Sequence, residues 1–417
     1  MKKLMTFTLL GLLILGFALP LTAQSPARAT DAGPTTNQVA DTTAETAWNF
    51  VNSGQTLTIG KTNSVILADL NGNGDLHILE SNDFSNRRWT NDGHGVFFFL
   101  PTNYGAGGQE SAVADLNGDG HLDFFVARGR VTLADTGENQ VWLAAENNSF
   151  ITFQNSGQQL GNANSRGVAL ADLNGDGFVD AFVANSRYGG DPPVSNANTV
   201  WFNDGAGNFS DSGQRLGISD SEAVALADLN GDGFVDAAVA NGGSTTRSNK
   251  VWFNDGDGNF SDSGQDLGFD WSWDVVIGDV NGDSHPDLMF GTFGGNAQLW
   301  LNNGSGVFSN SGQPFADGQS VALGDLDGDN DLDLVIGKSS VVGSNQVWEN
   351  DGSGNFTNSG LSLGSEVVYD IALGDVDRDG DLDILFAGNG SDEVLWFNQT
   401  PQNFVVVATI YLPLVIR

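Results

Sequence analysis

The stretch that decides the fold is Ala171 to Asp180, A-D-L-N-G-D-G-F-V-D, which returns almost unchanged at Ala227 to Asp236. Five weaker copies begin at further aspartates, namely Asp69, Asp115, Asp279, Asp325 and Asp375. We number each copy from its first Asp and refer to the copies, in chain order, as loops 1 to 7. Oxygen-bearing side chains recur at positions 1, 3, 5 and 9 of the loops.

In loops 2 to 7 these oxygen-bearing residues are Asp115, Asn117, Asp119 and Asp123; Asp172, Asn174, Asp176 and Asp180; Asp228, Asn230, Asp232 and Asp236; Asp279, Asn281, Asp283 and Asp287; Asp325, Asp327, Asp329 and Asp333; and Asp375, Asp377, Asp379 and Asp383. Calcium takes about six to eight oxygen ligands, and a backbone carbonyl near position 7 would complete the set. The absence of nitrogen and sulfur donors disfavours zinc and copper. The pattern predicts about six calcium ions per chain.

Loop 1 departs from the pattern. It has Asp69, Asn71 and Asn73, but His77 stands at position 9, so we expect a weak or empty seventh site. The alternative for every loop is a metal-free turn, because Asp, Asn and Gly favour turns in any case. An EF-hand is disfavoured because position 12 is apolar, as at Val183, and the flanking segments are typical of short strands rather than helices.

Composition limits the possible functions. The chain has 417 residues, a formal net charge of −36 and no cysteine. So acidic a chain lacks the basic surface that binds nucleic acid, and no disulfide can stabilise the fold. Much of the acidity lies in the loops, where bound calcium would neutralise it.

Three segments flank or precede the repeats. Residues 1–23 resemble a signal peptide, with Lys2 and Lys3 before an apolar run that is short for a membrane anchor. We therefore predict a secreted or cell-surface protein with no membrane span after cleavage, in a compartment where calcium is plentiful. Residues 24–47 are predicted to be a flexible linker. Residues 404–417 form an apolar tail, for which a sorting signal and an added edge strand are both open.

The spacing of the loops predicts the fold. The first aspartates lie 46 to 57 residues apart, a period that indicates propeller blades. Each unit has four strand-like pieces, which in the third unit are Gly167–Ala171, Phe178–Ala184, Thr199–Asn203 and Asn208–Gln214. We predict an all-β, seven-bladed propeller of four-stranded antiparallel blades over residues 48–403.

One Trp recurs in each third strand, where core packing between blades is the simplest role. These residues are Trp89, Trp142, Trp201, Trp252, Trp300, Trp348 and Trp396. The fourth strand recurs as N-F-S-D-S-G-Q at Asn208, and a near copy stands at Asn49 to Gln55, before any loop. The seventh unit has no such phrase, so Asn49 to Leu57 is predicted to complete the last blade and remove the open edge.

The motifs V-A-L-A-D-L-N-G-D-G-F-V-D and V-W-F-N-D-G-x-G-N-F resemble the FG-GAP/VCBS repeats of integrin α-subunit heads and of many bacterial exported proteins. The resemblance covers residues 48 to about 403. It implies a seven-bladed propeller with calcium between the first two strands of each blade, and it implies no particular ligand. The departures are His77, the diverged third strand at 141–147, and Ser284 and Asn330 at position 6, which is usually Gly.

A second ring of residues stands six positions before each first Asp. Its members are Asn63, Gln109, Arg166, Glu222, Trp273, Gln319 and Tyr369. They should begin the innermost strands, on the face opposite the loops, where the longest variable connections also lie. Aromatic rings beside charged and amide groups could hold a sugar or a peptide, and we single out five candidate ligand-binding residues: Arg166, Glu222, Trp271, Trp273 and Tyr369. The alternative is that they are solvated strand starts.

No catalytic constellation is evident. None of the four His pairs with a Ser or Cys motif, and the loops account for most carboxylates. We therefore expect a monomeric extracellular binding or adhesion module for a glycan or protein ligand, with structural calcium, rather than an enzyme. A carbohydrate-active hydrolase or lyase on a propeller scaffold is the first alternative, and a surface-layer component is the second.

Overall fold

The computed structural model describes residues 48–57, 60–105, 107–129, 137–147, 150–187, 197–242, 248–340, 342–388 and 393–400. They belong to one compact unit that begins at Thr46. The predicted signal peptide, linker and apolar tail lie outside the described residues. Within these ranges the chain forms strands and turns and no helix.

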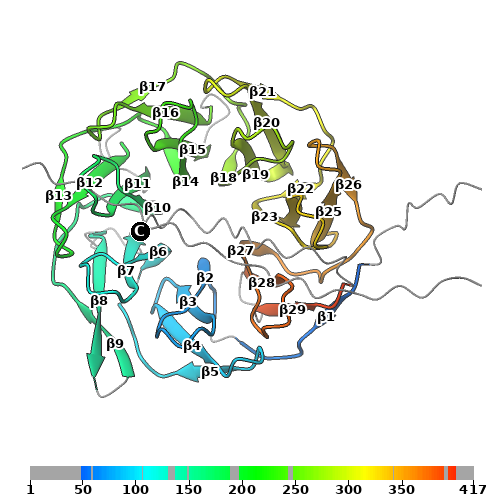
Figure 1. Cartoon of the computed structure of the whole chain (residues 1–417), viewed down its shortest axis with the longest axis horizontal. Helices are drawn as coiled ribbons and strands as arrows, with labels where there is room; N and C mark the ends of the chain where they lie inside the picture. Colours follow the sequence, from blue (N-terminus) through cyan, green and yellow to red (C-terminus); the bar gives the residue numbers. More distant parts are fainter. Residues whose placement is uncertain are drawn as a thin grey trace, which may run out of the picture. The chain divides into compact units, whose positions relative to one another are not determined.

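Seven antiparallel sheets stand around a central axis as propeller blades, in chain order around the ring (Figure 1). Blades 1 to 3 contain β2 (Ser64–Ala68), β3 (His77–Ser81), β4 (Arg87–Asn91) and β5 (Phe97–Leu100); β6 (Gly108–Ala114), β7 (Asp123–Arg128), β8 (Gln140–Asn147) and β9 (Phe150–Asn155); and β10 (Asn164–Ala171), β11 (Asp180–Ser186), β12 (Thr199–Asn203) and β13 (Phe209–Asp211). The all-β propeller prediction is confirmed.

Blades 4 to 6 contain β14 (Asp220–Ala227), β15 (Asp236–Gly242), β16 (Lys250–Asn254) and β17 (Phe260–Asp262); β18 (Ser272–Gly278), β19 (Asp287–Asn296), β20 (Gln298–Asn302), β21 (Phe308–Asn310) and the short β22 (Asp317–Gly318), which pairs with β19; and β23 (Ser320–Gly324), β24 (Asp333–Gly337), β25 (Gln346–Asn350) and β26 (Phe356–Asn358). In every blade the loop joins the first and second strands.

Blade 7 is assembled from both ends of the propeller. Its order is β1-β29-β28-β27, from β27 (Val368–Gly374), β28 (Asp383–Gly388), β29 (Val394–Asn398) and β1 (Phe50–Asn52). The strand β1 pairs antiparallel to β29, with Asn52 opposite Trp396. The strand that precedes the first loop thus forms the outer edge of the last blade, where its backbone groups satisfy those of β29.

The core lies between blades rather than within them. Seven hydrophobic clusters each join two neighbouring blades, one cluster at each seam around the ring. Every residue of the second strands β11, β15, β24 and β28 is buried, as expected for sheets packed on both faces. The recurrent Trp residues belong to these clusters, and Trp201 is 7% exposed, which confirms their predicted role in the core.

Hydrogen bonds reinforce five of the seven seams in one repeated way. The Gln that ends the N-F-S-D-S-G-Q phrase reaches into the next blade, where its Nε2 donates to a Gly carbonyl and its Oε1 accepts from a Phe backbone N–H. We call this contact the Gln latch. It is made by Gln55, Gln158, Gln214, Gln265 and Gln313. Gln55 bonds Gly95 and Phe97, so it ties blade 7 to blade 1.

Candidate metal loops and pore-mouth cavity

The loops are held in shape by their own side chains. In loop 3, the Asp172 carboxylate accepts the N–H of Gly175 at 2.8 Å and that of Gly177 at 2.8 Å, and Asn174 caps Asp176 at 2.9 Å. Such Asx turns curl the chain around the side-chain oxygens of positions 1, 3 and 5. Gly175 and Gly177 both have φ near +75° to +90°, a region that glycine adopts without a steric penalty.

Position 9 links each loop to the rest of the ring. Asp180 is fully buried, and its carboxylate accepts the N–H of Leu173 at 3.1 Å and the N–H of Asn203, in the third strand, at 2.8 Å. The Asn203 side chain then donates to the Leu116 carbonyl of the preceding loop at 2.8 Å. Because a carboxylate oxygen has two lone-pair sites, each can accept one hydrogen bond and still ligate a cation.

The same bond from a third-strand Asn to the preceding loop recurs at six seams. The donors are Asn91, Asn203, Asn254, Asn302, Asn350 and Asn398, with distances of 2.7 to 2.9 Å to the position-2 carbonyl. A change in the shape of one loop is therefore transmitted directly to the next blade.

Clustered acid groups make the loops unfavourable as bare anions. Burial, together with the charges of nearby loop carboxylates, raises the pKa of Asp180 and of Asp236 to about 7 and that of Asp383 to about 8. Backbone N–H donors oppose the shift without cancelling it. A hard dication would remove this cost, and the all-oxygen donor set of loops 2 to 7 fits calcium.

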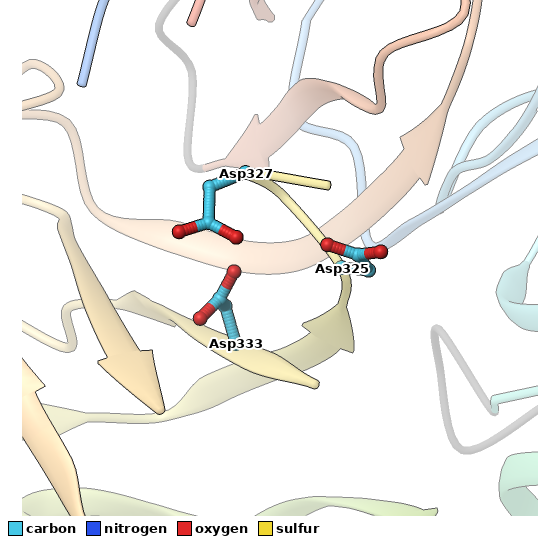
Figure 2. Close-up of side chains that lie close together, drawn as sticks. All are labelled: Asp325, Asp327 and Asp333. Carbon is cyan, nitrogen blue, oxygen red and sulfur yellow. The ribbon is translucent and has the colours of Figure 1, made fainter. Parts of the chain in front are cut away.

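Loops 6 and 7 are the most acidic, with Asp at position 3 as well. Carboxylate oxygens of Asp325, Asp327 and Asp333 lie within 4.8 Å of one another (Figure 2), and the same is true of Asp375, Asp377 and Asp383. Oxygens at this separation can share one cation, so these two loops have the strongest geometric case for metal binding.

Loop 1 does not fit a calcium ion. Burial lowers the pKa of His77 to about 4, helped by the Arg88 charge, so the imidazole is neutral near pH 7. Its Nδ1 accepts the Asn91 N–H at 3.0 Å, in the place where the other loops use one oxygen of the position-9 Asp. The guanidinium of Arg378, from loop 7, lies 2.8 Å from Asp75 of loop 1.

The predicted ring meets at one cavity. A hollow of about 200 Å³ is lined by Lys61, Asn63, Gln109, Arg166, Glu222, Trp273 and Tyr369. Six of these seven residues are ring positions, which stand just before the innermost strand, as Asn63 does, or at its second or third residue. We call this hollow the pore-mouth cavity. The structure thus brings together Arg166, Glu222, Trp273 and Tyr369, the candidates from blades 3, 4, 5 and 7.

Charged and aromatic groups share the walls of the cavity. The Trp273 and Tyr369 rings stack at 6.3 Å with an interplanar angle of 19°, and Lys61 Nζ lies 5.3 Å from the Tyr369 ring centre. Arg166 donates to Gln109 at 2.5 Å and lies 3.6 Å from Glu222. Burial raises the pKa of Glu222, although the Arg166 charge opposes the shift.

The ring residue Gln319 and the candidate Trp271 lie apart from the cavity. Gln319 is fully buried, donates to the Val368 carbonyl at 2.7 Å, and is not among the cavity-lining residues. Trp271 does not line the cavity either. It is 42% exposed and packs against Trp273 and Phe293, with ring centres 6.3 and 5.2 Å away. The cavity therefore continues into an exposed aromatic surface.

Several partly or fully buried carboxyl groups stand outside the motifs that the sequence singled out. Glu110, Asp274 and Asp370 are one residue beyond the ring, and each accepts a backbone N–H from the next blade's first strand at 2.8 to 3.1 Å. Glu80 and Glu393 are buried together at the seam of blades 1 and 7. The sequence does distinguish Glu110, Asp274 and Asp370, because the other blades carry Ser, Gly or Ala at this position next to the ring.

Family comparison agrees with the geometry. The model of the FG-GAP-like repeat matches five overlapping segments, residues 115–183, 172–239, 228–290, 279–336 and 325–386, which together span more than half of the chain. The chain belongs to the FG-GAP-like repeat family. Each match runs from one loop into the second strand of the next blade. No curated protein matches this FG-GAP propeller.

Solved structures share the fold of this FG-GAP propeller at low sequence identity. Chains in two crystal structures of BBS1N in complex with ARL6DN, soaked with lead or mercury, match at 11% identity, covering 86% of this chain and 99% of theirs, with TM-scores of 0.55 and 0.53. An Agrocybe aegerita lectin, whose structure concerns recognition of non-reducing terminal N-acetylglucosamine, matches at 22% identity with a TM-score of 0.46, covering 73% of this chain and 81% of the lectin.

A search of the described residues for membrane spans found no helix of sufficient length and apolar character.

Proposed function

We propose that this FG-GAP propeller is an exported, calcium-stabilised module that binds a glycan at the pore-mouth cavity. The observation that carries the proposal is the convergence of ring residues from several blades on one cavity, where aromatic faces lie beside amide and ionic groups. Sugar rings present apolar C–H faces edged by hydroxyl groups, so such walls suit them. The apolar run that follows Lys2 and Lys3 supports export.

Calcium in this proposal is structural. The loops lie on the connections between first and second strands, whereas the cavity is lined at the opposite ends of the first strands. Each of loops 2 to 7 is bonded to the next blade, whose third-strand Asn donates to the position-2 carbonyl of the loop. Ions in loops 2 to 7 would therefore stabilise the seams, and the charge they neutralise would not act on a ligand directly.

The test is a glycan array with the purified, calcium-loaded protein, followed by titration of the best glycan. The double variant Trp271→Ala/Trp273→Ala should keep the fold and lose binding at least tenfold. A matched control is Phe178→Ala/Phe234→Ala, which removes two aromatics, each 44% exposed, from loops 3 and 4. Binding that survives the Trp changes, or that the control abolishes equally, would refute the site.

A carbohydrate-active enzyme is the second candidate, and Glu222 is the observation that favours it. This carboxyl lines the cavity and has a raised pKa, as a general acid requires. Glycoside hydrolysis ordinarily uses two carboxyl groups, and Glu222 is the one carboxyl among the described cavity-lining residues. Release of reducing ends from a bound glycan, lost in Glu222→Gln, would favour the enzyme over the binding module.

A further inference from the structure

We propose that loop 1 binds no calcium and that Arg378, reaching across from loop 7, is its permanent cation. The inference rests on the proposed calcium binding of the other loops and concerns the seam where the ring closes. Three independent features of the described residues support it: the lone pairs of His77, the contacts of Asp75, and the backbone of Arg378.

The first feature is the loss of a ligand at position 9. His77 Nδ1 accepts the Asn91 N–H, so the one lone pair of the neutral imidazole is already used, and the proton must sit on Nε2. An Asp at this position has spare lone pairs after accepting two N–H groups, as Asp180 does. In loop 1 the second of these N–H groups, from Leu70, donates to the Ala68 carbonyl instead. His77 therefore accepts the third-strand N–H as the position-9 Asp does in other loops, but it has no free lone pair with which to bind a metal.

The second feature is that a cation is already present. Arg378 Nη2 lies 2.8 Å from Asp75 Oδ1 and 3.3 Å from the Asn73 carbonyl. The other Asp75 oxygen accepts the Asn73 side-chain amide at 2.7 Å. Positions 1, 3, 5 and 9 of loop 1 carry one carboxylate, that of Asp69, against three or four in loops 2 to 7, and Asp75 at position 7 is the second carboxylate of loop 1. Because Arg378 pairs with Asp75, Asp69 is the one carboxylate of loop 1 left for an ion.

The third feature is the backbone at position 4. Six loops have Gly there, with φ between +72° and +78°, but loop 7 has Arg378 at φ +64°. A side chain in this region costs about 1 kcal/mol or more relative to Gly. In loops 2 to 5 the position-4 Gly faces a Gly carbonyl in the turn of the next blade. The same location in loop 7 faces blade 1, so only there does a long side chain reach loop 1.

These contacts give the closing seam an ion pair that needs no metal. Blades 7 and 1 stand at the two ends of the propeller sequence, and the Gln latch of Gln55 also crosses the seam between them. A fixed cation there would hold loops 7 and 1 together during calcium depletion, while the other seams lose the ions of their loops.

The experiment counts calcium in the full-length protein by equilibrium dialysis against millimolar calcium and elemental analysis. Wild type should hold about six ions, as should Arg378→Gly, because His77 remains. The triple variant Asn73→Asp/His77→Asp/Arg378→Gly gives loop 1 the ligand set of loops 2 to 5 and should gain one ion. Seven ions in the wild type, or no gain in a folded triple variant, would overturn the inference.

A second readout covers the case in which the triple variant fails to fold. Arg378→Met keeps a side chain at positive φ and removes the guanidinium, so it should lower the melting temperature equally with calcium and with chelator. Asp329→Asn in loop 6 keeps the oxygen that accepts the Asp331 N–H and should lower the melting temperature only with calcium. An Arg378→Met effect confined to calcium-loaded protein would contradict the inference. A wild type with no bound calcium would instead refute the proposed function and leave the chelator measurement of Arg378→Met to decide the ion pair.

Discussion

Removal of one Gln latch should weaken one seam by a measurable and bounded amount. In Gln214→Ala the seam between blades 3 and 4 loses a bond of 2.7 Å to the Gly258 carbonyl and one of 2.8 Å from the Phe260 N–H. Each such bond contributes about 0.5–1.5 kcal/mol net. Gly258 and Phe260 are buried but alternate with the exposed Asp257 and Asn259, and both bonds are only partly buried, so we expect water to pair with the freed groups and add no large burial penalty. The expected loss of stability is about 1–3 kcal/mol.

The assay is thermal unfolding of the calcium-loaded protein, where this loss corresponds to roughly 2–6 °C. The control is Arg215→Ala, the adjacent residue, whose half-exposed ion pair with Asp211 should contribute little. The latches sit at separate seams, so their effects should add. A Gln214→Ala variant that melts with the wild type, or an Arg215→Ala variant that loses as much, would refute the view that the Gln latch holds the blades together.

Three further predictions concern charge and packing. Burial raises the pKa of Asp274 to about 6 and, with the Asp274 charge, that of Asp370 to about 7. Folded protein thus retains protons that unfolded protein releases above about pH 4, so stability should fall from about pH 4 to 7. Asp274→Asn/Asp370→Asn removes both titrating groups and keeps one acceptor oxygen at each position. It should lower stability overall but flatten this fall in denaturant melts made with chelator, and an unchanged slope would contradict the prediction. Asp327→Asn gives loop 6 the ligand set of loops 3 to 5 and should weaken its calcium affinity several-fold in titrations. An unchanged calcium affinity would contradict this prediction. Trp201→Ala should cost about 3–5 kcal/mol in chemical unfolding, against less than about 1 kcal/mol for the exposed Trp271→Ala; equal losses would place Trp201 outside the core.

The repeated loop made the fold predictable. A recurring element with four strand-like pieces, spaced at blade length, leaves few closed arrangements, and the spare outer-strand phrase at Asn49 points to its partner at the far end of the chain. The third-unit strands β10 to β13 lie within a few residues of their predicted ranges. Phe178 is an exception, because it was assigned to a strand but lies in loop 3 and is 44% exposed.

The cavity could be predicted only in part. Ring positions follow from strand register, so their meeting at one end of the pore is a consequence of symmetry. Gln319 does not line the cavity because its side-chain amide donates to the buried carbonyl of Val368 in the next blade. The sequence does not reveal this partner. Asp220 belongs to no motif of the repeat, yet it is buried and pairs with Arg187 at 2.8 Å.

Contacts between blades lay beyond the sequence for a related reason. The recurrent Gln and Asn can be recognised in the repeat sequence, but their hydrogen-bond partners lie in a neighbouring blade. These partners are about 40 to 90 residues away in the chain or lie across the closing seam. Arg378 shows the limit most clearly, because Asn73 and Asp75 lie some 300 residues earlier in the chain. Such pairs require the ring geometry before they can be identified.

Stabilisation of the seams by calcium is the central claim. The most direct test is to measure the melting temperature of the wild type while free calcium is raised from nanomolar, set by a chelator, to millimolar. Each of the ions in loops 2 to 7 at extracellular affinity should add roughly 0.4–1.4 kcal/mol at millimolar calcium. Together they approach the stability of an ordinary domain, so we predict a rise of many degrees, with magnesium a poor substitute. A melting temperature that does not change over this range would contradict the account.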